Sequence, residues 1–389
     1  MKKFYKITLA VLSIGLAATL AGCNGCSSCN NSRKNLTVTN SNWFAGTSYK
    51  GIQPSFIIND IENKENDIRW NDIEDIDYEM TFTKPNEGKA NSDYSVDYKD
   101  GSFKTKFYAF HYDWNKLEPC NKPENTDENI EVLYYYETQM NVSVQYTFKD
   151  GAKSEWFEDS MISECYFRAA GKSLQPVYSK QEIKSTSPNK NKPKSLEDSY
   201  KSIDVVYENH YNRNCTEIKS VTKEAGKEAS EKVYSVKKVK NTLFDNSSLY
   251  IAMRSMKLSV DYSQTISLFS AAEGGVSSYA VNGSETPLGD KIKAVSDELA
   301  KNGLYYPVTQ DDEGNPIEDK GINTVAMNIN NVSGNLYGTT QTVWYAAIEN
   351  QDNNTARATM LKISIPVSYN LGTLNFTLKN INSTLWNGK

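Results

Sequence analysis

Histidine is nearly absent from this chain, whose 389 residues include only His111 and His210. Neither belongs to the H-E-x-x-H pattern that places two zinc ligands on one face of a helix. The sequence also lacks the G-x-S-x-G turn of serine hydrolases, a Walker-type phosphate loop and the G-x-G-x-x-G turn of dinucleotide-binding domains. We therefore expect a protein that is not an enzyme and that uses no cofactor.

Excess positive charge is missing as well. The chain carries 43 basic and 48 acidic residues, a formal net charge of −5. A surface of this sign repels the phosphates of nucleic acids and the anionic headgroups of membranes. We expect no nucleic-acid partner, and any affinity for a membrane should have another source.

The N-terminus supplies that source. A basic stretch precedes the apolar run 7–20, and the small residues of Leu20-Ala21-Gly22 lead to Cys23. The apolar run is shorter than the roughly 20 residues of a membrane-spanning helix, which indicates a cleaved signal segment. We predict a lipoprotein signal peptide over residues 1–22 and diacylglycerol and palmitate attached to Cys23. The mature protein would be held on the outer face of the cell membrane, or in the periplasm of a cell with two membranes.

Six cysteines fall into two groups, Cys23, Cys26 and Cys29 near the anchor and Cys120, Cys165 and Cys215 in the body. The C-x-x-C-x-x-C spacing suits a metal cluster, but lipidation would convert Cys23 to a thioether. The Asn-, Ser- and Gly-rich flanks instead predict a flexible tether over residues 23–35, and we expect no metal. The three body cysteines allow one disulfide at most, or half-buried thiols.

Alternation of apolar and polar residues dominates from Leu36 onward. Residues 94–98 alternate, Asp100-Gly101 offers a tight turn, and 103–109 continue the alternation, which predicts a hairpin. Residues 140–148 alternate in the same way and end at the turn Asp150-Gly151.

A third hairpin is predicted near the C-terminus. Residues 361–369 share one apolar face, Asn370-Leu371-Gly372 turns, and 374–378 return; Pro366 predicts an edge or a bulge. Further strands are expected at 76–82, 258–262, 266–269, 325–329 and 343–348. The many aromatic residues in these runs favour an antiparallel sheet with one buried face.

Two segments have helical spacing instead. In the first, Asp245 can cap a run with apolar residues on one face: Leu249, Ala252, Met253 and Met256. In the second, Gly303 can end a run with a similar stripe: Ile292, Val295 and Leu299. We expect a mainly β (α+β) fold in which both helices lie on a long antiparallel sheet.

The domain organisation follows from these elements. Residues 36–389 are predicted to form a single elaborated β-rich domain. The lysine-rich stretch 180–202 has the composition of a solvated loop and marks a candidate sub-boundary.

Three polar clusters resemble catalytic or metal-binding sites only weakly. His111-Tyr112-Asp113-Trp114 is typical of a strand end, and the acidic residues of 72–79 are typical of a solvated strand face although glycoside hydrolysis also uses paired carboxylates. Asp311-Asp312-Glu313-Gly314-Asn315 has the composition of a calcium loop, but Gly314 comes fourth rather than sixth. A polar hairpin loop explains it better.

Several short motifs follow one another in a familiar order. They are the strand segment 173–179, the capped helix 244–254, the pair Trp344-Tyr345, the triplet Ile365-Pro366-Val367 and Leu371-Gly372-Thr373-Leu374. In this order the chain resembles an uncharacterised family of exported bacterial lipoproteins that is thought to share the curved, unclosed β-barrel of the LolA and LppX carriers.

The resemblance implies a sheet wrapped around the first helix, with a concave apolar face that holds acyl chains. By position, the helix would be Ser247 to Met256, and Leu249, Met253, Met256 and Trp344 would line a ligand pocket. The same four residues also fit a dry core, as in any α+β domain. The function expected is non-enzymatic binding of a lipid or other apolar ligand; an extracellular adhesion or structural module that binds protein or glycan is the alternative.

Overall fold

The computed structural model describes residues 74–86, 94–121, 123, 127–170, 173–188, 200–236, 243–254, 256, 260–284, 286, 288, 292–304, 322, 324–331, 340–350, 355–367 and 370–382. Cys23, the signal peptide, the tether and the Asp311 loop lie outside the described residues, so their predictions stay untested. Most of the described chain is β-strand, and all of its strands belong to one 16-stranded sheet.

The first half of the sheet contains nine strands. They are β1 (Glu74–Thr83), β2 (Tyr94–Asp113), β3 (Glu118–Cys120), β4 (Ile130–Phe148), β5 (Phe157–Ala170), β6 (Ser173–Pro188), β7 (Tyr200–Tyr211), β8 (Glu217–Glu224) and β9 (Ser230–Ser235). The second half contains β10 (Leu243–Asp245), β11 (Ser263–Ser270), β12 (Gly275–Ser284), β13 (Val325–Asn331), β14 (Gln341–Asn350), β15 (Thr355–Val367) and β16 (Gly372–Asn382).

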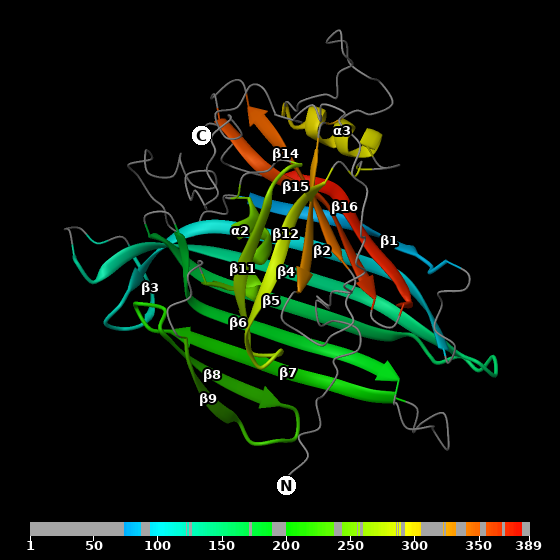
Figure 1. Ribbon diagram of the computed structural model, residues 1–389, viewed down its shortest axis with the longest axis horizontal. Coiled ribbons are helices and arrows are strands. Elements are labelled where there is room, and N and C mark those ends of the chain that lie inside the picture. The colour runs from blue at the N-terminus through cyan, green and yellow to red at the C-terminus, as the bar shows by residue number, and fades with distance from the viewer. Residues whose placement is uncertain are drawn as a thin grey trace, which may run out of the picture.

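The two halves are joined where the first strand pairs with the last. The order across the sheet runs from β10 through β16, then from β1 through β9, with β3 paired to β2 as a side branch. Neighbours are antiparallel except β10 and β11, which are parallel. The sheet curls so that β11 and β12 lie opposite the long strands β4 to β7 (Figure 1). It is one long curved sheet that does not close, as the sequence predicted.

The inner face of the sheet is apolar because apolar residues at alternate positions of one strand pair with apolar residues of the next strand. On β2, β4 and β5, Phe107 pairs with Tyr136, and Tyr136 pairs with Cys165. All three side chains are 3% exposed or less. Alternation with a period of two therefore fixes which residues enter the core.

The hairpin predicted at Asp100-Gly101 is wrong, because β2 runs straight through these residues. They oppose a single residue of β4, since Lys99 pairs with Ser143 and Ser102 pairs with Asn141. Asp100 has a φ of 51°, which accommodates the extra residue as a bulge. The bulge also shifts the parity, so that apolar residues at even positions before it and at odd positions after it face the same side.

The two other predicted hairpins are confirmed. A turn with Gly151 in the left-handed region (φ 86°) connects β4 to β5, and Asn370 (φ 57°) and Gly372 (φ 129°) form the turn between β15 and β16. Pro366 pairs with β16 but lies beyond the last pair between β14 and β15, Thr342 with Ser364. At Pro366, β15 therefore has one neighbouring strand instead of two, which fits the predicted edge.

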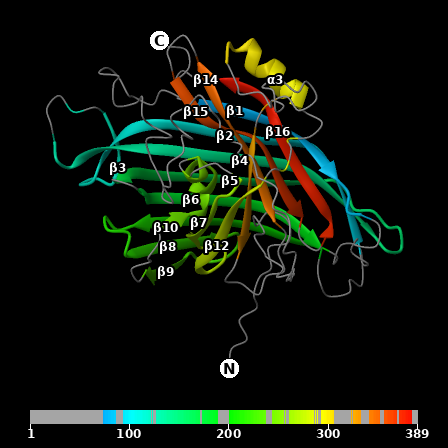
Figure 2. The same ribbon diagram turned by 45° about the horizontal axis from the view of Figure 1, so that its top comes forward.

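Both helices form, but the first is shorter than predicted. Asp245 caps a 3-10 turn, η2 (Asn246–Ser248), which leads into α2 (Leu249–Met253). Helix α2 lies inside the curved sheet, between β11–β12 and β4–β6 (Figures 1 and 2). Helix α3 (Ile292–Lys301) ends before Gly303 (φ 66°) and packs beside β16.

Two other predictions need correction. Residues 260–262 of the predicted strand 258–262 are not in a strand. Residues 180–188 and 200–202, predicted as part of a loop, belong to the adjacent antiparallel strands β6 and β7. Lysines lie on the outer face of β6, and a lysine-rich composition is also typical of loops.

The two free edges of the sheet meet through side chains, and we call this contact the seam. The buried carboxylate of Asp245 on β10 accepts hydrogen bonds from Ser179 of β6 (2.6 Å) and from the hydroxyl of Tyr211 on β7. The ring of Phe269 on β11 lies 6.0 Å from that of Tyr211 and 5.1 Å from that of Tyr234 on β9.

Within the described residues, no helix is both long and apolar enough to cross a membrane.

The bulge in β2 gives a stability prediction. A Cβ at Gly101 would lie 2.1 Å from the Sδ of Met80 on β1, whereas a Cβ at Gly151 would meet nothing within 4 Å. Gly101→Ala should cost about 2–3 kcal/mol through overpacking, and Gly151→Ala about 1 kcal/mol through left-handed strain. Urea denaturation measures both free energies of unfolding. If Gly151→Ala lowers the free energy of unfolding as much as Gly101→Ala or more, Gly101 does not pack against Met80 as described.

Candidate functional site

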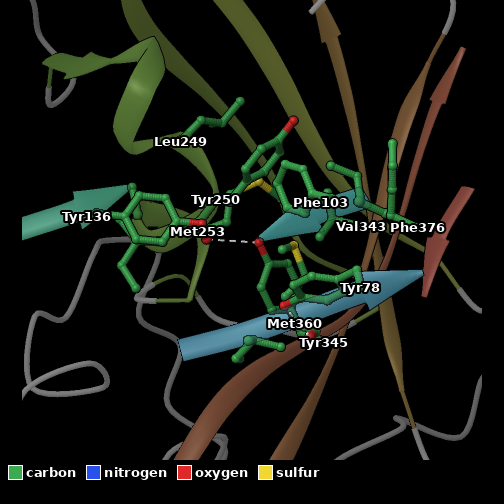
Figure 3. Close-up of a cluster of buried hydrophobic side chains, with 14 of the residues drawn as sticks. Tyr78, Phe103, Tyr136, Leu249, Tyr250, Met253, Val343, Tyr345, Met360 and Phe376 are labelled. Carbon is green, nitrogen blue, oxygen red and sulfur yellow. Dashed lines mark hydrogen bonds between the residues drawn. The ribbon is translucent and has the colours of Figure 1, made fainter. Parts of the chain in front are cut away.

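Three of the four predicted pocket residues lie together inside the sheet. Leu249, Met253 and Met256 are 1% exposed or less. Figure 3 shows Leu249 and Met253 beside Tyr250 and the inner wall formed by Phe103, Tyr78 and Phe376. The ring of Phe103 lies 5.5 Å from the rings of Tyr78 and Phe376, and 6.2 Å from that of Tyr250. The helix stripe therefore contacts the concave face of the sheet.

Trp344 is not brought to this helix. Its neighbour Tyr345 points inward and donates from its hydroxyl to the backbone oxygen of Tyr250 (2.9 Å). The Trp344 indole instead donates to the backbone oxygen of Thr286 (2.8 Å) and lies under the ammonium of Lys362, 4.7 Å from the ring centroid. Adjacent strand residues face opposite sides, so the predicted place of Trp344 in the pocket is wrong.

A buried ion pair fixes the helix end to β1. The guanidinium of Arg254 donates to both carboxylate oxygens of Glu74, at 2.6 and 3.1 Å, and both side chains are less than 5% exposed. Burial lowers the pKa of Arg254, but the charge and the hydrogen bonds of Glu74, with smaller contributions from Tyr136 and Tyr78, together raise it above its usual value. The pair has no solvent to screen it, and each charge depends on the other.

Aromatic rings gather where the inner face reaches the end of the sheet at which β6 stops and β7 begins, on the right of Figure 1. We call five half-buried residues the aromatic rim: Phe82, Tyr94, Phe148, Phe157 and Tyr200. Tyr146 is fully buried behind them, with ring centroids at 6.0 Å from Tyr94, 5.9 Å from Tyr200 and 6.4 Å from Phe157.

Asp159 of β5 lies in the inner layer of this cluster. Its side chain is fully buried, and its two oxygens accept hydrogen bonds from the backbone N–H of Thr186 (2.8 Å) and the hydroxyl of Ser185 (3.0 Å). Burial raises the pKa of Asp159 to about 7, although these hydrogen bonds favour the charged form; Glu158 raises the pKa further. The carboxyl therefore changes charge near neutral pH.

Tyr98 completes the cluster. Its ring is 9% exposed and lies 4.9 Å from the ring of Phe82. Within the described part of the chain, its buried hydroxyl has no hydrogen-bond partner. Burial, with the charge of Asp159 nearby, raises the pKa of Tyr98, so this hydroxyl stays protonated and can donate. An unsatisfied buried donor is costly, so this hydroxyl is a candidate contact for a bound molecule.

The weaker sequence candidates have structural roles. Asp113 caps the turn after β2 through the backbone N–H of Asn115 (2.8 Å). In the acidic stretch, Glu74 pairs with Arg254 and Asp77 pairs with Lys104 (2.9 Å), while Asp72 lies outside the described residues. Cys120, Cys165 and Cys215 are free thiols. No group of three metal-ligating side chains occurs in the described ranges.

Sequence reasoning missed Asp159. It alternates with Met161 and Cys165 on a strand that the pattern did not assign, and an acid among apolar alternate positions was the available signal. Tyr98 and Tyr146 were assigned to strands but not to a site.

The comparisons with known proteins give little. No protein-family model matches the sequence, and no curated protein is significantly similar to it. The chain is similar to a crystal structure of a β-barrel-like protein of a domain of unknown function, DUF1849, from Brucella abortus. The two are 8% identical with a TM-score of 0.39, over 79% of this chain and 96% of that chain.

The raised pKa of Asp159 predicts a stability change with pH. The folded chain holds the proton more tightly than an unfolded chain with a pKa near 3.8, so this contribution is complete below pH 4 and is lost as the pH rises through about 7. Asn cannot ionise; its amide oxygen can accept from the backbone N–H of Thr186, and its amide nitrogen can donate to the hydroxyl of Ser185. Between pH 5 and pH 8, Asp159→Asn should gain about 1–3 kcal/mol relative to the parent.

Denaturant titrations at both pH values measure this gain. The matched control is Asp150→Asn in the exposed turn of the same β4–β5 hairpin, whose carboxylate accepts from the backbone N–H of Ala152. Parallel pH profiles of Asp159→Asn and the parent would contradict the burial of this carboxyl.

The buried ion pair predicts strong coupling. Arg254→Met leaves the Glu74 charge without a partner and should cost about 3–5 kcal/mol, whereas adding Glu74→Gln should restore part of the loss. A double-mutant cycle of unfolding free energies measures the coupling. Additive losses would show that the two side chains do not interact.

Proposed function

We propose that the protein is a membrane-anchored, non-enzymatic lipoprotein that binds an apolar ligand, such as a lipid, at the concave face of its sheet. The aromatic rim carries this proposal, because its half-buried rings pack against the apolar inner wall and also reach solvent. Ligand sites are typically concave, mainly apolar and aromatic, and contain a few directed polar groups. Tyr98 and Asp159 supply such groups.

The interior suits a ligand of variable shape. The apolar stripe on the inner wall contains Met253 of α2 and Met256 just beyond the helix, whose unbranched side chains adapt to different neighbours. The seam is held by side chains and not by a backbone ladder, so local opening breaks fewer hydrogen bonds than it would in a closed barrel. Kinship with the LolA and LppX carriers belongs to the same proposal.

The anchor gives the binding domain its place. Lipid on Cys23 and a polar tether over 23–35 would hold the domain near a membrane, where apolar ligands are concentrated. A net charge that disfavours anionic headgroups leaves the acyl chains as the source of attachment.

One observation favours adhesion as a second candidate function. On the outer face, directly paired residues form an aromatic ladder across β2, β4, β5, β6 and β7: Tyr108, Tyr135, Tyr166, Tyr178 and His210. Successive ring centroids are 4.5, 5.7, 5.1 and 5.1 Å apart. Tyr166 and Tyr178 are half-buried and His210 is exposed, so this end of the ladder can stack on a partner such as a glycan.

A fluorescent fatty-acid probe tests the leading proposal. The full chain carrying Cys23→Ser, which cannot be acylated, should bind the probe with micromolar affinity. Phe157→Ala removes a rim ring and should weaken binding about tenfold, equivalent to ~1.4 kcal/mol. The measurement is a fluorescence titration with displacement by unlabelled lipid.

Trp156→Ala is the matched control, because Trp156 precedes Phe157 but is 36% exposed and stacks with Lys99. This variant should bind the probe as the parent does. If the parent binds no probe, and immobilised polysaccharide retains the parent but not Tyr178→Ala, the adhesion function replaces the lipid-binding one.

A further inference from the structure

Asp159 is a buried carboxyl without a counter-ion among the described residues. The charged group that bears on its pKa is Glu158, which is also acidic. No lysine or arginine of the described residues is among the groups that act on the pKa of Asp159. A buried carboxylate in a folded protein is ordinarily paired with a cation or a metal.

The surroundings of Asp159 are aromatic. Its charge raises the pKa of both Tyr98 and Tyr146, so the carboxyl lies close to these two rings. Tyr94, Phe157 and Tyr200 surround Tyr146 on the solvent side, and Phe157 and Tyr200 are themselves 4.9 Å apart. Faces of such rings attract cations, and rings grouped around one position form the aromatic cages that bind alkylated ammonium groups.

We propose that Asp159, Tyr98, Tyr146 and the rim rings of Tyr94 and Tyr200 form a binding site for an alkylated ammonium group. The carboxylate is the counter-ion and the rings provide cation–π contacts. The hydroxyl of Tyr98, which is buried and has no partner, donates to an oxygen that accompanies the ammonium group in the ligand.

The donor set disfavours other cations. Calcium and magnesium require several oxygen ligands, whereas this site offers one carboxylate whose oxygens already accept two hydrogen bonds. An alkylated ammonium is large, weakly hydrated and stabilised by aromatic faces. Access to the buried carboxyl requires the rim rings to rotate, which partly exposed side chains do rapidly.

This inference rests on the proposed function in placing the ligand at the aromatic rim, and it specifies the ligand chemistry there. The ammonium group can belong to a lipid headgroup of the phosphocholine type or to a free small molecule. Both sources present the same chemistry to the cage.

Calorimetric titration of the full chain carrying Cys23→Ser tests the site with three probes: choline, dodecylphosphocholine and 3,3-dimethylbutanol, the neutral isostere of choline. Choline and dodecylphosphocholine should bind, and the isostere should bind at least tenfold more weakly. Because the cation requires ionised Asp159, affinity should rise about five- to tenfold from pH 6 to pH 8.

Substitutions isolate the carboxylate. Asp159→Asn should lose at least tenfold in choline affinity and should lose the pH dependence, while Asp150→Asn should leave both unchanged. Equal binding of choline and its neutral isostere would overturn the proposal, as would a pH-independent affinity in the parent. The pH profile needs no variant, so it decides even if Asp159→Asn does not fold.

Other outcomes separate this site from the proposed function. Dodecylphosphocholine that binds tenfold or more tightly than choline supports a lipid headgroup as the source, and equal affinities support a free ammonium compound. Choline binding without binding of the fatty-acid probe supports the cation site and removes the lipid-binding function. Probe binding without any ammonium binding retains that function and overturns the cation site.

Discussion

The structure depends on one meeting of distant side chains, the seam at which the sheet curls back on itself. Asp245 provides its centre, because the same carboxylate caps the turn before α2 through Ser247 (2.7 Å) and accepts hydrogen bonds from β6 and β7. Burial raises the pKa of Asp245, while these hydrogen bonds favour its charged form. One residue therefore starts the enclosed helix and also places it against the opposite wall. The Glu74–Arg254 pair joins β1 to the end of this enclosed helix.

Local periodicity predicted much of the sheet, because one buried face imposes a period of two on each strand. It could not distinguish a turn from a bulge at Asp100-Gly101, since both use the same residue types and both restore the apolar alternation. It missed β7, β8 and β9, whose outer faces and exposed edge are rich in lysine, glutamate and serine. Whether such residues form a turn, a bulge or an edge strand depends on the strand that pairs with them, and the local sequence pattern does not identify that strand.

The candidate site was less predictable than the fold. The stripe of α2 was found because helical spacing is local, and its contact with the inner wall follows from burial. Trp344 was misplaced because the run Val343-Trp344-Tyr345-Ala346 is apolar and buried on both faces, so the sequence pattern does not show which of Trp344 and Tyr345 points inward. Asp159 and Tyr98 come from different strands, and only the register of β2, β4 and β5 brings them to one end of the sheet. A carboxyl without a counter-ion is visible only when its neighbours are known.

The order of strands also has a consequence for how the chain could be rewired. Asp75 at the start of β1 pairs with Asn382 at the end of β16, so the first and last described strands lie side by side in the middle of the sheet. The true edges, β9 and β10, are consecutive in the sequence. A circular permutant that begins at β10 and ends at β9 would thus run through the sheet in spatial order, with its new termini at the seam. In the natural chain, the segment between β9 and β10 connects the two edges of the sheet covalently. The first and last described strands, β1 and β16, are instead held together by backbone hydrogen bonds.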